Sequence, residues 1–312
     1  MYDFLILATG LVVLVFAGDY LVRGAVSLAE QLGISPTIIG LTIVAFGTSA
    51  PELFVSVQAA LDEAPGIALG NIIGSNTANI LLVLGAPAII APLAITSKGL
   101  RSSLAYMMGL TFTLIWFMHT DARITQLEGL ILFVILITYL IWQFIRVKSQ
   151  RNGNSAEVDD MPESTSDVKK IALFLIIGVI GLPIGAYLTV ESASSIARSF
   201  DISEAIIGVT VVAIGTSLPE LITSVMAAIR RSGGVALGNV VGSNIFNIGL
   251  ILGSTALIHP LDVDPHFMNF DIPMMVFASL ILVLLAVLSK PLQTWGGALM
   301  LVGYTSYVSL SF

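Results

Sequence analysis

The chain has 312 residues, of which 56% are hydrophobic and only 11% are charged. Soluble domains carry about 25% charged residues, so this composition and a mean hydropathy of +0.97 exclude a water-soluble protein and indicate a multi-pass membrane protein. The absence of cysteine excludes disulfides, Cys-ligated zinc and a thiol nucleophile. A net charge of −7 argues against a nucleic-acid partner, which requires clustered Lys and Arg.

Long apolar segments recur along the whole chain. A helix needs about 20 mostly apolar residues to cross the hydrocarbon core. The first segment has no Lys or Arg before it and no cleavage pattern after it, so we expect a span and not a signal peptide. The sequence therefore predicts an all-α membrane protein with ten transmembrane helices, over residues 4–22, 37–60, 66–93, 103–118, 127–145, 171–197, 205–229, 235–258, 272–289 and 294–312.

The longest polar stretch divides these segments into two sets of five. We expect a first five-helix repeat over 1–146, a cytoplasmic linker over 147–169 and a second five-helix repeat over 170–312. With both termini outside, eleven of the 13 basic residues fall in inner loops and two in outer loops. The positive-inside rule therefore predicts this orientation in the cell membrane.

An internal repeat relates the two halves. Residues 32–93 align with 200–261 without gaps, and 35 of the 62 positions are identical. Because each half has an odd number of helices, the second copy is expected to insert upside down. Inverted repeats are typical of secondary transporters, whose substrate sites lie near the midplane. Packing alone would preserve apolar and small residues, whereas here the polar residues are repeated too.

One carboxylate lies near the middle of an apolar segment in each copy: Glu52 in the first and Glu220 in the second. An ionisable group at this depth costs about 2.5–3.5 kcal/mol on insertion scales. No Lys or Arg lies at mid-depth to pair with either. A protonated Glu hydrogen-bonded in the core is the structural alternative, but a duplicated carboxylate without a basic partner favours a cation site.

Hydroxyl groups accompany both carboxylates. Thr48 and Ser49 precede Glu52 by four and three residues, so helical spacing puts their hydroxyls near its face. The second copy repeats this pattern with Thr216 and Ser217. A proline directly before each Glu is expected to leave carbonyls of the preceding turn without their donors.

The next segment of each copy adds further polar groups. They are Asn71, Ser75, Asn76 and Asn79, and their counterparts Asn239, Ser243, Asn244 and Asn247. Two carboxylates with hydroxyl, amide and carbonyl oxygens form an all-oxygen site, which suits Ca²⁺ better than Mg²⁺ or softer metals. Na⁺ is the natural competitor.

Four sequence blocks carry a family resemblance. GTSAPEL and GTSLPEL, followed by GNIIGSNTAN and GNVVGSNIFN, resemble the two α-repeats of the cation/calcium exchanger superfamily, in particular its prokaryotic sodium/calcium exchanger branch. The resemblance implies an antiporter of Na⁺ and Ca²⁺ in the lipid bilayer, with no cofactor and no protein partner. It implies that the ions bind Glu52, Glu220, Thr48, Ser49, Ser75, Asn79, Thr216, Ser217, Ser243 and Asn247 and the backbone carbonyls of Ala45 and Ala213.

One departure from this family leaves alternatives open. Some members carry Asp where this chain has Asn247, so only two formal charges remain, and the Na⁺ stoichiometry and any K⁺ dependence stay open. An H⁺/Ca²⁺ exchanger or a K⁺-dependent exchanger of the same fold is the alternative. The chain has no acidic or His residue near Ser75–Asn79, and this absence favours Na⁺ over H⁺ as the coupling ion. A cation channel would show flux without a counter-ion. An enzyme is not expected, because no HExxH or GxSxG motif occurs.

Overall fold

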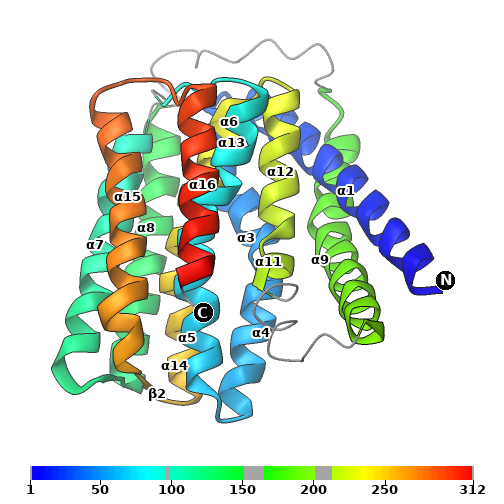
Figure 1. Ribbon diagram of the computed structural model, residues 1–312. Coiled ribbons are helices and arrows are strands. Elements are labelled where there is room, and N and C mark those ends of the chain that lie inside the picture. The colour runs from blue at the N-terminus through cyan, green and yellow to red at the C-terminus, as the bar shows by residue number, and fades with distance from the viewer. Residues whose placement is uncertain (1, 96–98, 151–164, 201–212, 311–312) are drawn as a thin grey trace.

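The computed structural model describes residues 2–95, 99–150, 165–200 and 213–310, which are almost wholly helical (Figure 1). The predicted linker over 147–169 lies largely outside them. In the described part, a short antiparallel pairing joins β1 (Arg123–Ile124) to β2 (Leu261–Asp262). The prediction of an all-α protein is confirmed.

In the first half, long uninterrupted helices flank two interrupted ones. The interruptions are π-helical turns, labelled η, and a break at Ser49. The elements are α1 (Tyr2–Leu32), α2 (Pro36–Ile39), η1 (Gly40–Val44), α3 (Ala45–Thr48), α4 (Ala50–Leu61), α5 (Pro65–Ala78), η2 (Asn79–Val83), α6 (Gly85–Ile90), α7 (Leu100–Asp121) and α8 (Gln126–Gln150).

The second half repeats this order. Its elements are α9 (Val168–Ser199), α11 (Ala213–Thr216), α12 (Leu218–Ile229), α13 (Gly233–Phe246), η4 (Asn247–Leu252), α14 (Gly253–Ile258), η5 (Phe267–Asp271), α15 (Ile272–Val287) and α16 (Thr294–Leu310). The helices α12, α13 and α14 begin and end 168 residues after α4, α5 and α6. The sequence repeat is therefore also a repeat of secondary structure.

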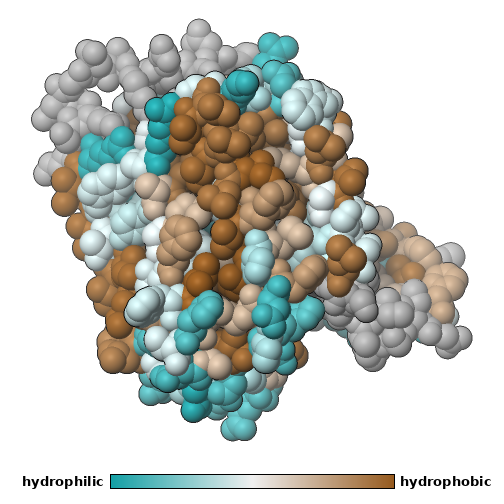
Figure 2. All heavy atoms as spheres, turned by 60° about the vertical axis from the view of Figure 1, so that its left-hand side comes forward, coloured by the Kyte–Doolittle hydropathy of each residue, from teal (hydrophilic) through white to brown (hydrophobic). Residues whose placement is uncertain are grey.

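Several of these helices are suited to a bilayer. Six described spans are long and apolar enough to cross a membrane, and a seventh results if α2 to α4, bent by 46° at the break, counts as one. The six are Tyr2–Leu32, Pro65–Ile90, Gln126–Arg146, Val168–Ser199, Gly233–Ile258 and Phe267–Val287. Hydrophobic residues cover much of the face shown in Figure 2, and hydrophilic residues gather toward its lower end. The protein is a multi-pass membrane protein.

Close backbone packing brings the helices together. The helices α1 and α9 run along each other at one edge of the molecule (Figure 1), where a Cβ on Gly178 would lie 2.4 Å from Cβ of Leu21. Helix α13 is buried from Val235 to Phe246. A Cβ on Gly238 would lie 2.3 Å from the carbonyl oxygen of Thr37, so only glycine permits α13 to pack against α2.

Candidate cation-binding site

Each carboxylate lies at the start of a helix that follows a break. Ser49 (φ −82°, ψ 10°) and Ser217 (φ −85°, ψ 3°) interrupt the helical path, and α4 and α12 begin at the next residue. The prolines therefore stand in the first turn of a new helix, where a missing N–H costs nothing, and not inside a helix as the sequence suggested. Glu52 and Glu220 occupy the same first turns, where the helix dipole favours negative charge.

An asparagine holds each of these first turns. Asn239 Nδ2 donates to the backbone carbonyl of Glu220 at 3.3 Å and to Ser224 Oγ at 3.2 Å. In the other copy, Asn71 Nδ2 donates to the carbonyl of Glu52 at 3.1 Å and to Ser56 Oγ at 2.8 Å. These bonds fix each broken helix to the neighbouring α5 or α13. The same contacts occur twice because the repeat preserves all their members.

The hydroxyls of the break act across the two copies. Ser49 Oγ donates to Oε1 of Glu220 at 3.0 Å, and Ser243 Oγ donates to the same oxygen at 3.4 Å. Helical spacing had put Ser49 beside Glu52. That spacing fails because the helix breaks at Ser49 itself, so its hydroxyl turns to the carboxylate of the other half. Thr48 Oγ1 likewise donates to Oδ1 of Asn239 at 3.0 Å.

Six buried oxygens of the predicted ligands have no hydrogen-bond partner within the described residues. They are both carboxylate oxygens of Glu52, Oε2 of Glu220, Oδ1 of Asn79 and of Asn247, and Oγ of Ser217. A buried acceptor without a partner costs about 1–3 kcal/mol, and more when charged. The exposed fraction of Glu52 is 1% and that of Glu220 is 0%, so water contributes little. A bound cation is the kind of partner that such oxygens lack.

The electrostatics agree with this reading. The carboxylates lie close enough to repel each other. Of the ion pairs recorded in the described part of the chain, none includes Glu52 or Glu220. The described residues also contain no cluster of three or more His, Cys, Asp or Glu. The donor set is therefore oxygen from two carboxylates, amides and hydroxyls, which suits a hard cation such as Ca²⁺.

The two asparagines with unpaired oxygens lie at matching irregularities. Asn79 begins η2, and Asn247 begins η4. Isolated π-turns in helices are frequent at functional sites. The packing again crosses the copies, because η2 lies against α12 and η4 against α4. Each π-turn that begins with one of these asparagines therefore packs against the helix that carries the carboxylate of the opposite half.

The other predicted ligands are arranged less uniformly. Ser75 and Ser217 are buried, with exposed fractions of 4% and 1%. Thr216 donates to Oδ1 of Asn71 at 3.5 Å. The carbonyl of Ala45 accepts the N–H of Ser49 at 3.1 Å, and Thr48 Oγ1, which donates to Asn239, lies 3.3 Å from the same carbonyl oxygen. Ala213 begins α11.

Sequence reasoning missed two residues of the site framework. Ser56 and Ser224 each lie four residues after a Glu and receive the clamping asparagine. The sequence did contain a signal for them, because Ser56 and Ser224 are identical between the two copies. A single serine in an apolar helix is common, however, and does not by itself indicate a site.

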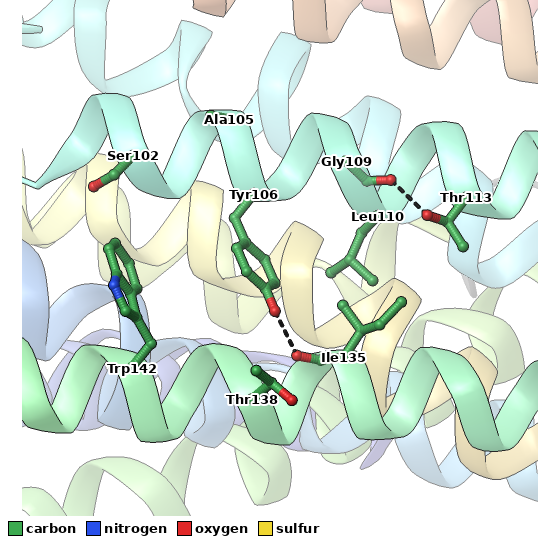
Figure 3. Close-up of a pocket in the computed structure, with 9 residues that line it drawn as sticks. All are labelled: Ser102, Ala105, Tyr106, Gly109, Leu110, Thr113, Ile135, Thr138 and Trp142. Carbon is green, nitrogen blue, oxygen red and sulfur yellow. Dashed lines mark hydrogen bonds between the residues drawn. The ribbon is translucent and has the colours of Figure 1, made fainter.

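A separate pocket of about 680 Å³ lies between α7 and α8 (Figure 3). Its lining includes Trp142 and Tyr106, whose hydroxyl donates to the carbonyl of Ile135 at 2.7 Å. None of the predicted ligands and no carboxylate lines it. The candidate cation site is therefore the one between the two halves and not this pocket.

The fold and the buried oxygens together define the class: a helical membrane protein with a candidate site for a hard cation between its two halves. The chain matches the family model of the sodium/calcium exchanger proteins over residues 2–145 and 170–312. It belongs to the sodium/calcium exchanger family.

Similar proteins cover almost the whole chain. The sodium/calcium exchanger MaX1 of Methanosarcina acetivorans is 34% identical, over 99% of this chain and 98% of its own. An inner membrane protein of Escherichia coli, YrbG, is 35% identical, over 96% of this chain and 93% of its own. The structure of the sodium-calcium exchanger NCX_Mj, soaked with 2.5 mM Na⁺ and 0.1 mM Ca²⁺, is similar with a TM-score of 0.86 and 36% identity, covering 99% of this chain and 98% of that one.

Proposed function

We propose that the protein is a secondary antiporter that exchanges Na⁺ for Ca²⁺ across the cell membrane at one shared site. The observation that carries this proposal is the pair of buried carboxylates, Glu52 and Glu220, whose unpaired oxygens face a site without a basic partner among the described residues. Two carboxylates balance one Ca²⁺. Membership of the sodium/calcium exchanger family supports the same ions.

The ligand set is the second part of the proposal. Ca²⁺ takes six to eight oxygens in flexible geometry, and this site offers carboxylate, amide and hydroxyl oxygens from both halves. We assign ion binding to Glu52, Glu220, Thr48, Ser49, Ser75, Asn79, Thr216, Ser217, Ser243 and Asn247, with the carbonyls of Ala45 and Ala213. The unpaired oxygens of Glu52, Glu220, Asn79 and Asn247 support their direct participation.

We further propose ten spans in two inverted five-helix repeats, joined by an inner linker, with both termini outside. Contacts between loops support this topology. The Arg123–Asp262 ion pair joins two loops expected outside, and the pairing of Leu93 with Leu292 joins the inner end of the third expected span to a loop expected inside. Helix α1 begins, and helix α16 ends, in the lower half of Figure 1, toward β2.

Alternating access follows from the charges. With both carboxylates ionised and no cation bound, repulsion in a low-dielectric interior opposes closure of the site. Ca²⁺ or several Na⁺ ions neutralise the pair and permit the change, which couples the two fluxes. The α1 and α9 pair is the proposed moving unit, because these helices pack mainly on each other. Each net charge moved per cycle is worth about 2.3 kcal/mol per 100 mV.

Proteoliposomes test the proposal. Vesicles loaded with Na⁺ are diluted into Na⁺-free buffer, and ⁴⁵Ca²⁺ uptake is followed, with K⁺-loaded vesicles and an imposed pH gradient as controls. We expect uptake that requires the Na⁺ gradient. Uptake driven by a pH gradient alone would place the chain with proton-coupled exchangers, and uptake without any counter-ion would indicate a channel. A K⁺ requirement would appear as uptake into Na⁺-loaded vesicles that occurs only when the outer buffer contains K⁺ together with Ca²⁺.

A further inference from the structure

Asn244, which was not among the predicted ligands, connects the two halves directly behind the site. Its Nδ2 donates to the backbone carbonyl of Asn76 at 3.3 Å, and its Oδ1 accepts Nδ2 of Asn79 at 3.0 Å. The exposed fractions are 2% for Asn244 and 0% for Asn79. The two amides thus form a short hydrogen-bond chain, the relay, which begins at the backbone carbonyl of Asn76 and ends at the side chain of Asn79.

The direction of this relay is set by its first member. A backbone carbonyl can only accept a hydrogen bond, so Asn244 must turn its NH₂ group to Asn76 and its oxygen to Asn79. Asn79 must then turn its own NH₂ to Asn244. Its Oδ1 is left buried and accepts no hydrogen bond from the described residues. If the amide of Asn79 were flipped, its Oδ1 would face Oδ1 of Asn244, and its NH₂ group would point to the cation.

The other half contains a matching contact. Asn247 Nδ2 donates to Oδ1 of Asn76 at 2.9 Å, and Oδ1 of Asn247 is likewise buried and unpaired among the described residues. Each candidate ligand amide is therefore held by an asparagine of the opposite copy. Asn76 and Asn244 belong to the same repeated motif, which explains why the arrangement occurs twice.

We propose that Asn244 is a positioning residue, which sets Ca²⁺ affinity by making Asn79 present its oxygen to the ion. This inference rests on the proposed exchange function and names a residue that acts on the ion only through another. Partners that orient a metal ligand typically contribute about 10–100-fold to metal affinity. We expect the same range here in the KM for Ca²⁺, with the maximal rate within about twofold of wild type.

The test uses a ligand whose orientation needs no partner. The two oxygens of Asp are equivalent, so N79D presents an oxygen whichever way the group turns. KM for Ca²⁺ is measured in Na⁺-loaded proteoliposomes for wild type, N244L, N79D and the double variant N244L/N79D. We expect N244L to raise KM by about 10–100-fold in the wild-type background, and to leave it unchanged or lower it in the N79D background. This comparison subtracts the effect of the added charge.

The second copy supplies a matched control. N247D should not restore the KM for Ca²⁺ of N244L, because Asn244 orients Asn79. N247D should restore the KM of N76L, because Asn76 orients Asn247. Size-exclusion profiles and thermal unfolding report folding, and N244A replaces N244L if the leucine variant does not fold. An equal rise of KM in both backgrounds, or no rise in either, overturns the proposal. Failure of the exchange function itself would appear already as absent Na⁺-driven uptake in the wild type.

Discussion

Replacing Glu220 by Gln is the most direct test of the site. Oε1 of Glu220 accepts the hydroxyls of Ser49 and Ser243, and a Gln oxygen can accept both. The amide NH₂ then takes the place of Oε2, which accepts no hydrogen bond from the described residues. E220Q therefore changes a cation ligand into a donor while the shape and the hydroxyl contacts are kept.

The expected size of the effect follows from the removed charge. Ca²⁺ at about 2.4 Å from one carboxylate oxygen, at an effective dielectric constant of about 20, is attracted by about 14 kcal/mol before desolvation. Breaking a buried ion pair costs about 3–5 kcal/mol net. Ca²⁺ affinity should therefore fall by between about one hundred and several thousand fold. The fold should not suffer, because the charge has no basic partner among the described residues.

The assay combines transport with stability. Initial ⁴⁵Ca²⁺ uptake is measured over a range of Ca²⁺ in Na⁺-loaded vesicles, and unfolding is followed by the fluorescence of the three tryptophans, because a chain without cysteine gives no signal with thiol dyes. E191Q is the matched control, since Glu191 is exposed on α9. The reasoning would be refuted if the KM of E220Q for Ca²⁺ lay within about threefold of the wild-type KM. It would also be refuted if E220Q without Ca²⁺ melted well below the wild-type protein without Ca²⁺.

Three further predictions concern the framework and the ligand. N239A leaves the buried carbonyl of Glu220 and the hydroxyl of Ser224 without their donor, so it should lower the free energy of unfolding by about 1–3 kcal/mol. N71A should lower it less, because Asn71 is only half-buried. Equal losses of the two variants in thermal unfolding would contradict this prediction. G238A places a Cβ 2.3 Å from the carbonyl of Thr37 and should reduce the yield of folded protein in size exclusion, whereas G303A, with no described atom within 4 Å, should not. Ca²⁺ at 100 times its Kd should stabilise the fold by about 2.7 kcal/mol, a gain that chelation removes and Na⁺ reduces; a gain insensitive to Na⁺ would contradict a shared site.

The sequence alone determined much of this protein. Apolar segments of bilayer length and a low charge content predicted an all-α membrane protein, because the bilayer demands both. A gapless repeat with shared polar residues located Glu52 and Glu220, because ionisable groups in apolar segments are costly unless they have a function. The same repeat pointed to the asparagines of the following segments, without indicating what each of them contacts.

Only the tertiary structure decided which groups meet. Spacing assigned Ser49 to Glu52, but the helix break gives its hydroxyl to Glu220, a residue 171 positions away. The roles of Asn79 and Asn244 differ for the same reason. Both are buried amides, yet one leaves an oxygen unpaired at the site while the other binds a backbone carbonyl of the opposite copy. Sequence periodicity describes neighbours along one helix, whereas this site is formed by side chains that cross between two repeats, and only packing specifies those contacts.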